Sequence, residues 1–157
     1  MDQGVAKMLL AIDLGLRLGW ARYDRGGRLV AYHAQHYGNR DQLKRAVWGI
    51  MSGGDAPLEV LIMEGDRGLG ALFAKLGHKW GVEVVFTDAH VWRPSLMDPK
   101  RRRSGEDAKA YADRLARAVI TASGAPEPTA LRHDAAEAIL VGLWGVLARD
   151  WLDATPW

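Results

Sequence analysis

The sequence predicts a single α/β domain in which helices flank a mixed five-stranded sheet. Three observations predict this fold. Strand-like segments joined by tight turns come first, later strands alternate with helices, and 157 residues is the length of one domain. No internal repeat, linker or low-complexity segment divides the chain. We therefore expect three hairpin-connected strands, then parallel strands, within one domain over residues 1–157.

The expected strands are short segments bounded by turns. Residues 8–13 and 59–64 are apolar runs that end on a carboxylate, which is typical of strands buried on both faces. Residues 24–27 (Asp-Arg-Gly-Gly) predict a hairpin turn, because glycine takes a positive φ at little cost. The other expected strands are 18–24, 28–37 and 82–87.

The expected helices have apolar residues at helical spacing. Ser104 is the expected N-cap of the third helix, and the fourth is apolar nearly all round, so we expect it to be buried. Residues 90–103 contain two prolines and four consecutive cations, and we expect them to be irregular. The expected helices are 40–51, 69–80, 105–122 and 131–151.

Composition excludes several classes of site. The chain is 48% hydrophobic and 25% charged, as in folded domains, and its net charge is only +2. It has no cysteine, which excludes disulfides, thiolate zinc sites, iron–sulfur clusters and cysteine nucleophiles. We find no bilayer-spanning apolar run and no signal-peptide core, so we expect a cytoplasmic protein with no membrane partner.

Four acidic residues from separate segments are expected to converge. Asp13 and Glu64 end two strands, and such ends lie side by side if the strands are parallel neighbours. Asp134 and Glu137 are three residues apart, on one face of the last helix. Close carboxylates need a neutralising cation, and Mg²⁺ or Mn²⁺ prefers oxygen ligands. Two such ions can activate water for phosphodiester cleavage.

Each acid also has a simpler interpretation. Strand-end acids are often solvated or cap a following helix, and acids in a helix's first turn are favoured by its dipole. Asp66 and His133, which lie near these elements, are interpreted as surface groups.

Four motifs, in order along the chain, resemble the RuvC family of Holliday-junction resolvases, in the ribonuclease-H-like superfamily. The first pairs an Asp-x-Gly strand end with a following Gly-Trp, and the last resembles that family's terminal Asp-Ala-Ala-Asp-Ala helix. Asp-x-Gly also occurs in actin-like ATPases, whereas the four motifs together are more specific. They lie at 12–21, 61–64, 105–109 and 133–138.

The resemblance implies a ribonuclease-H-like fold and a Mg²⁺-dependent endonuclease that resolves four-way DNA junctions as a homodimer, without a small-molecule cofactor. Position by position, the four acids would hold the metals and Lys109 would lie near the scissile phosphate. The chain departs from the family twice. Glu137 stands where the family has aspartate, and Arg67 stands where it has a junction-opening aromatic residue.

A basic segment over 93–103 accompanies the acids, with five cations against one acid and a net charge of +4. It is expected to bind the phosphate backbone, and the alternative is a solvated loop. Trp92 is expected either to stack on an unpaired base or to belong to the core. The predicted DNA-binding residues are Arg67, Trp92, Arg93, Lys100, Arg101, Arg102, Arg103 and Lys109.

The homodimer is implied by the resemblance and suits the near two-fold symmetry of a four-way junction, and the apolar stripe of the helix 69–80 is its candidate interface. In the resembled family this helix forms much of the dimer interface, and the alternative is that the stripe packs on its own sheet. Its candidate residues are Leu72, Phe73, Leu76 and Trp80.

Three other functions stay open. They are a less selective nuclease of branched DNA or RNA–DNA hybrids, a junction-binding protein that does not cleave, and an actin-like nucleotide-binding domain. We disfavour the last because the chain supplies only one such half and no second glycine-rich phosphate loop.

Overall fold

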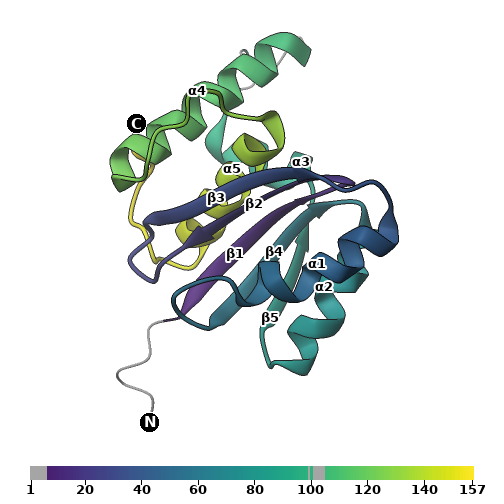
Figure 1. Cartoon of the computed structure of the whole chain (residues 1–157). Coiled ribbons are helices and arrows are strands. Elements are labelled where there is room, and N and C mark those ends of the chain that lie inside the picture. The colour runs from purple at the N-terminus through teal and green to yellow at the C-terminus, as the bar shows by residue number, and fades with distance from the viewer. Residues whose placement is uncertain (1–6, 99, 101–104) are drawn as a thin grey trace.

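The computed structural model describes residues 7–98, 100 and 105–157, and shows a sheet with helices on both faces (Figure 1). Ser104, the expected N-cap, lies outside these residues. The elements are β1 (Met8–Leu14), β2 (Arg17–Tyr23), β3 (Leu29–His36), α1 (Arg40–Ser52), β4 (Leu58–Gly65), α2 (Arg67–Lys79), β5 (Glu83–Thr87), α3 (Ala89–Leu96), α4 (Gly105–Ser123) and α5 (His133–Ala148).

The sheet has the order β3-β2-β1-β4-β5 and is mixed, as the sequence predicts. β1 pairs antiparallel with β2 and β2 antiparallel with β3, whereas β1, β4 and β5 are parallel. Asp24 closes the hairpin between β2 and β3 by accepting from the backbone N–H groups of Gly26 and Arg28. Gly27 has a φ of +79°, which a turn glycine adopts without strain.

The two faces of the sheet carry separate cores. Leu9 and Ala11 of β1 pack with α3, α4 and α5, whereas Leu10 and Ile12 pack with α1 and α2. This is the alternation expected of a strand that is covered on both faces. The two helical layers are visible above and below the sheet in Figure 1.

α5 lies closest to the sheet, and its sequence explains why. Its residues from Ala135 to Gly145 are buried except Trp144, which confirms the expectation of a buried last helix. A Cβ atom on Gly142 would overlap the ring of Tyr23, so only glycine permits this approach. The Tyr23 hydroxyl, which is fully buried, donates to the backbone carbonyl of Ile139.

The prediction that residues 90–103 are irregular is wrong for the part that forms α3. Residues Ala89–Leu96 form a helix even though Pro94 lies inside it. Trp92 and Leu96, four residues apart, are both buried in the core beside α5. Their burial favours the helix and opposes the cost of an internal proline, since a buried aromatic side chain contributes a large apolar area.

α2 packs part of its apolar stripe on the chain's own sheet and leaves part of it exposed. Phe73 is fully buried in the chain's own core and Leu72 and Leu76 are partly buried, whereas Trp80 is 40% exposed. Asp66, interpreted from the sequence as a surface group, caps α2 by accepting from the backbone N–H of Leu69.

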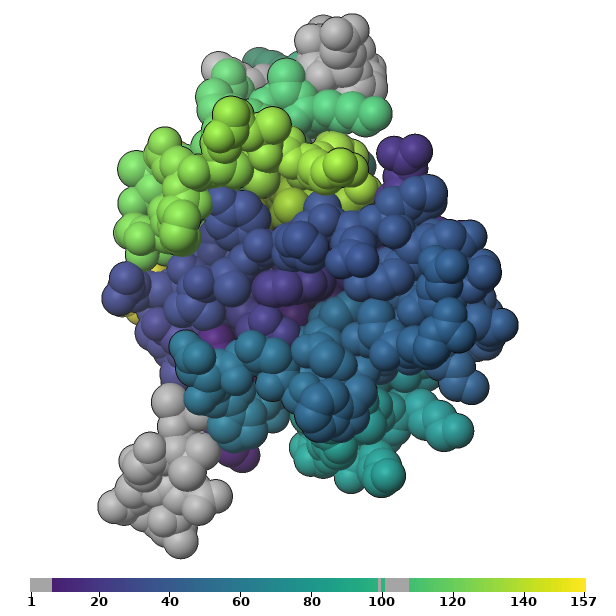
Figure 2. All heavy atoms as spheres, in the orientation of Figure 1, coloured from purple at the N-terminus to yellow at the C-terminus, as the bar shows by residue number. Residues whose placement is uncertain are grey.

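In the space-filling view α1 and the hairpin strands form one broad surface below α4 (Figure 2). No described helix has both the length and the apolar character needed to cross a membrane.

Candidate active site

Asp13 and Glu64 lie side by side at the ends of adjacent parallel strands. They are register partners in the pairing of β1 with β4, as their strand-end positions predict. Their side chains are hydrogen-bonded to each other, which helps to raise the pKa of Asp13 and acts to lower that of Glu64. Asp13 is also the register partner of Gly19 on β2, so three strand backbones meet at this point.

The acids of α5 reach the same place because β2 admits the helix's first turn. A Cβ atom on Gly19 would overlap the backbone carbonyl of Asp134, and this close approach therefore requires glycine. Asp134 and Glu137 both act electrostatically on Asp13. The structure thus brings together all four acids that the sequence selects.

The electrostatics of the cluster are those of acids held close with little solvent. Burial, followed by the charges of Glu64, Glu137 and Asp134, raises the pKa of Asp13 to about 8. Burial and the charge of Glu137 also raise the pKa of Glu64. Buried carboxylates that repel one another favour protonation of one member, as the Asp13–Glu64 hydrogen bond reflects.

Glu137 contacts two basic side chains. Arg93 of α3 donates to its Oε1, and His133 Nε2 lies 3.5 Å from the same oxygen. The side chain of Glu137 is only 6% exposed. Its second oxygen, Oε2, is buried and has no hydrogen-bond partner in the structure. One oxygen of this carboxylate is therefore occupied and the other is free.

The donor set fits a hard divalent cation. All four acids supply oxygen, the buried Oε2 of Glu137 lacks a partner, and the charges of three acids act on Asp13. Within the described residues, no three Asp, Glu or His side chains are arranged to hold one ion together. Coordination therefore requires these side chains to change rotamer and Asp13 to release its proton.

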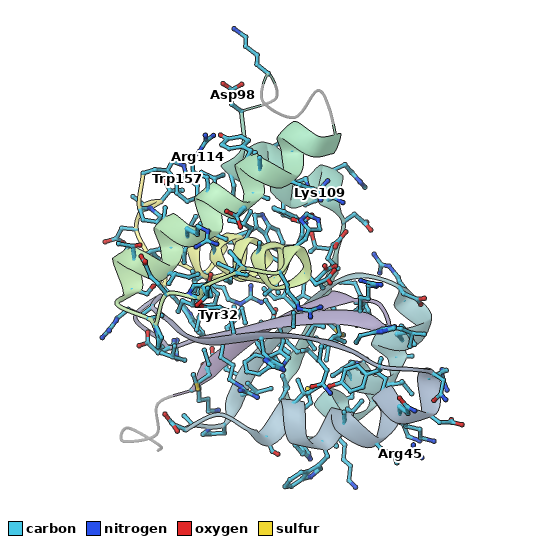
Figure 3. All side chains as sticks on the ribbon, turned by 45° about the horizontal axis from the view of Figure 1, so that its top comes forward. Tyr32, Arg45, Asp98, Lys109, Arg114 and Trp157 are labelled. Carbon is cyan, nitrogen blue, oxygen red and sulfur yellow. The ribbon has the colours of Figure 1, made fainter. Side chains whose placement is uncertain are left out.

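Lys109 lies beside the acids, as the family resemblance implies. It is exposed on α4, where Figure 3 labels it, on the opposite side of the sheet from Arg45 of α1. Together with Arg93, His133 and Glu137 it lines a hollow of about 260 Å³ between α3, α4 and α5. Three groups able to carry positive charge thus flank one carboxylate, an arrangement suited to a phosphate.

Arg67, where the resembled family has an aromatic residue, is the first residue of α2 and is exposed. Its guanidinium lies 4.8 Å from the centroid of the Phe86 ring and 3.5 Å from Asp88 Oδ2. It therefore lies next to the strand ends that carry the acids.

One predicted DNA contact is contradicted. Trp92 is fully buried in the core, so its ring is not available to stack on a base. Lys100 is exposed, and only its backbone N–H is engaged, with Asp98 at 3.0 Å, so the prediction for its side chain stays open. The prediction for 101–103 (Arg-Arg-Arg) lies outside the described residues.

The sequence analysis missed the contribution of two residues near the site. Asp88 directly follows β5, and its charge helps to raise the pKa of Glu64. The same strand-end rule that selected Asp13 and Glu64 points to it. His133, interpreted as a surface group, contacts Glu137 from the preceding turn of α5, a contact that the spacing of four residues allows.

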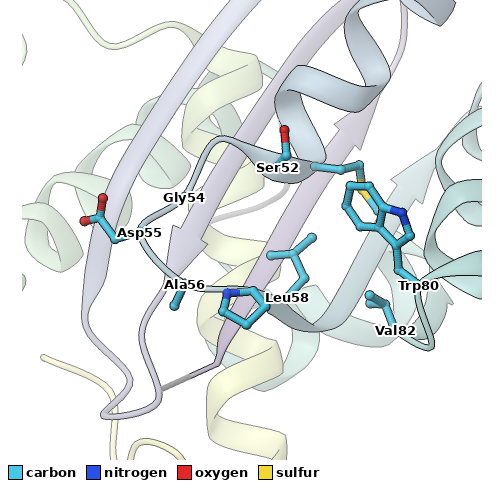
Figure 4. Close-up of a pocket in the computed structure, with 9 residues that line it drawn as sticks. Ser52, Gly54, Asp55, Ala56, Leu58, Trp80 and Val82 are labelled. Carbon is cyan, nitrogen blue, oxygen red and sulfur yellow. The ribbon is translucent and has the colours of Figure 1, made fainter. Parts of the chain in front are cut away.

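A second cavity lies away from the acids. It has a volume of about 440 Å³ near the start of β4 and the last turns of α1, and its labelled lining includes Asp55 and Trp80 (Figure 4). Asp55 is the only charged residue that lines it. It offers no cluster of catalytic groups, and the four-acid cluster remains the candidate site.

Comparisons with known proteins bear on the fold. No protein-family model matches the chain, and no curated protein matches it. The fowlpox virus Holliday junction resolvase superposes with a TM-score of 0.65 at 13% identity, over 90% of this chain and 99% of that protein. The fowlpox virus resolvase in complex with Holliday junction DNA gives 0.65 at 15% identity, over 90% and 98%. The chain therefore has the ribonuclease-H-like fold that its motifs imply.

Proposed function

We propose that this protein is a Mg²⁺-dependent endodeoxyribonuclease that resolves four-way DNA junctions. The observation that carries the proposal is the pairing of Asp13 with Glu64 at the carboxyl ends of β1 and β4, opposite the acids of α5. The likeness to a Holliday junction resolvase supports it at the level of the fold. We extend the proposal to the RuvC family because four sequence motifs resemble that family in order along the chain.

Each residue has a proposed role. Asp13, Glu64, Asp134 and Glu137 would hold the metal, and Mn²⁺ would substitute for Mg²⁺ because both accept oxygen ligands. When bound, the metal would supply an activated water and charge stabilisation for the leaving oxygen. Hydrolysis joins the water oxygen to phosphorus and breaks the bond from phosphorus to one bridging sugar oxygen.

The cations would position the nucleic acid. Lys109 and Arg93 would contact phosphates next to the acids, and Arg67 would contact the strand that passes the end of β4. The segment with Lys100, Arg101, Arg102 and Arg103 would bind phosphates farther along an arm. These contacts are independent of base sequence, because phosphate oxygens carry no sequence information.

We also propose that the enzyme is a homodimer, since a four-way junction presents two equivalent strands and suits two-fold symmetry. A groove of about 510 Å³ between α1 and α2 supports the apolar stripe of α2 as the dimer interface. Leu72 and Leu76 line it, and Trp48 beside them is 64% exposed. Sedimentation analysis at micromolar concentration tests the dimer separately, and a monomer would contradict this part alone.

The testing experiment compares a synthetic four-way junction with a linear duplex of the same sequence. We expect paired cuts in the junction with Mg²⁺ or Mn²⁺, none with EDTA, and at least about tenfold slower cleavage of the duplex. Equal cleavage of junction, flap and RNA–DNA hybrid would favour the less selective nuclease. Salt-sensitive junction binding with no cleavage in either metal would favour a binding protein.

A further inference from the structure

The contact between Arg93 and Glu137 places a cation of the protein on a carboxylate of the candidate metal site. Arg93 extends from α3 and Glu137 from α5, so two separate elements are joined through the pair. The Arg93 side chain is 33% exposed, whereas Glu137 is almost completely buried. The guanidinium therefore reaches from the surface onto a buried acid.

The cluster compensates its own charge in two ways. Asp13 and Glu64 are hydrogen-bonded to each other, and Glu137 is paired with Arg93. Arg93 also acts on Glu64, where its charge opposes the effect of burial. Two of the four acids are thus engaged with each other, and a third is engaged with a cation of the protein.

A divalent cation and a guanidinium that approach the same carboxylate repel each other. The repulsion is strong in a site with little solvent, because the effective dielectric constant there is well below that of water. Oε1 of Glu137 already accepts from Arg93, and only Oε2 is free. Metal binding at Glu137 therefore requires Arg93 either to remain at an electrostatic cost or to leave.

We infer that Arg93 is a positioning residue that competes with the metal for Glu137. This inference rests on the proposed metal-dependent function. In the metal-free protein the guanidinium neutralises Glu137 and keeps the cluster folded. Metal binding displaces it toward the hollow that it lines with Lys109, where it can pair with a substrate phosphate. Because Arg93 and the metal compete for Glu137, Arg93 leaves this carboxylate only when the metal binds.

The test is Mn²⁺ binding by titration calorimetry, without DNA, to the wild type, Arg93→Gln and Arg93→Lys. We expect Arg93→Gln to bind Mn²⁺ at least about fivefold more tightly, because a positive charge has been removed. Arg93→Lys keeps the charge and should bind like the wild type. Arg117→Gln is the matched control, since Arg117 pairs with Asp113 within α4, and it should leave the affinity unchanged.

Thermal unfolding supplies an independent reading. In EDTA we expect Arg93→Gln to melt at a lower temperature than the wild type, because Glu137 loses its counter-ion, and to gain more from added Mn²⁺. Mn²⁺ affinity that is unchanged or weaker in Arg93→Gln would overturn the inference, since an arginine that only braces Glu137 predicts that result. If neither protein binds Mn²⁺, the proposed metal-dependent function fails as well.

Discussion

Gly19 and Asp134 approach so closely that a side chain on residue 19 would overlap the backbone carbonyl of residue 134. Gly19 is also the register partner of Asp13. One glycine therefore sets how near the first turn of α5 comes to β1, and with it the spacing of the acids. The glycine of the first motif's Gly-Trp is thus explained by packing, independently of any family resemblance.

Substitution of this glycine should disturb both stability and the site. We expect Gly19→Ala to lower the free energy of unfolding by at least about 2 kcal/mol, because overpacking displaces the start of α5. Chemical denaturation measures the loss. Gly49→Ala is the control, since a Cβ atom there meets nothing within 4 Å on helix α1, and alanine favours helix. A loss as small as that of the control would contradict the packing argument.

Asp13→Asn should separate cleavage from binding. Asparagine keeps the shape of the side chain and removes the charge that the proposed metal needs, so we expect junction cleavage to fall more than about a hundredfold. Junction binding in EDTA, measured by fluorescence anisotropy, should stay within about twofold. Loss of binding together with cleavage would indicate that Asp13 supports the fold of the DNA-binding surface instead.

The stability of the metal-free protein should decrease as pH rises. The pKa of Asp13 is about 8 in the folded protein and 3.8 is its ordinary value, so the folded state binds the extra proton between these pH values. Stability therefore falls as pH increases through this range. The raised pKa of Glu64 acts in the same direction.

Melting temperatures in EDTA from pH 5 to pH 9 measure this effect. Asp13→Asn should melt higher than the wild type at pH 8 and show a shallower pH dependence, since asparagine cannot ionise. Added Mn²⁺ should restore the wild type at high pH, where the ionised acids bind it. A wild-type stability that rises steadily with pH in EDTA would contradict the charge repulsion described for the cluster.

Sequence patterns predicted the sheet well, because burial on both faces and hairpin turns leave strong local signals. Residues 8–13 and 59–64 are continuous apolar runs, and they form the two central strands. Helix α3 was missed because Pro94 and the neighbouring cations indicate a loop locally. Its stability comes from Trp92 against α5, a contact between residues far apart in the sequence.

The site could be predicted only in part for the same reason. The four acids follow from strand ends and helical spacing, which are local rules. That Arg93 contacts Glu137, 44 residues away, depends on how α3 packs on α5, and no local pattern encodes it. The role of Trp92, in the core or stacked on a base, likewise depends on how α3 packs, because the position of this helix determines whether the ring is buried.

Lys109→Ala should weaken junction binding without affecting the fold. Lys109 is exposed on α4 and lines the hollow beside Glu137, so its removal takes away one phosphate contact and no buried area. We expect the slope of log affinity against log salt to become shallower by about one. Arg45→Ala is the matched control, because Arg45 is exposed on α1, on the opposite side of the sheet from Lys109 (Figure 3). Equal changes for the two variants would show that the protein's overall charge, rather than the hollow beside Glu137, governs binding.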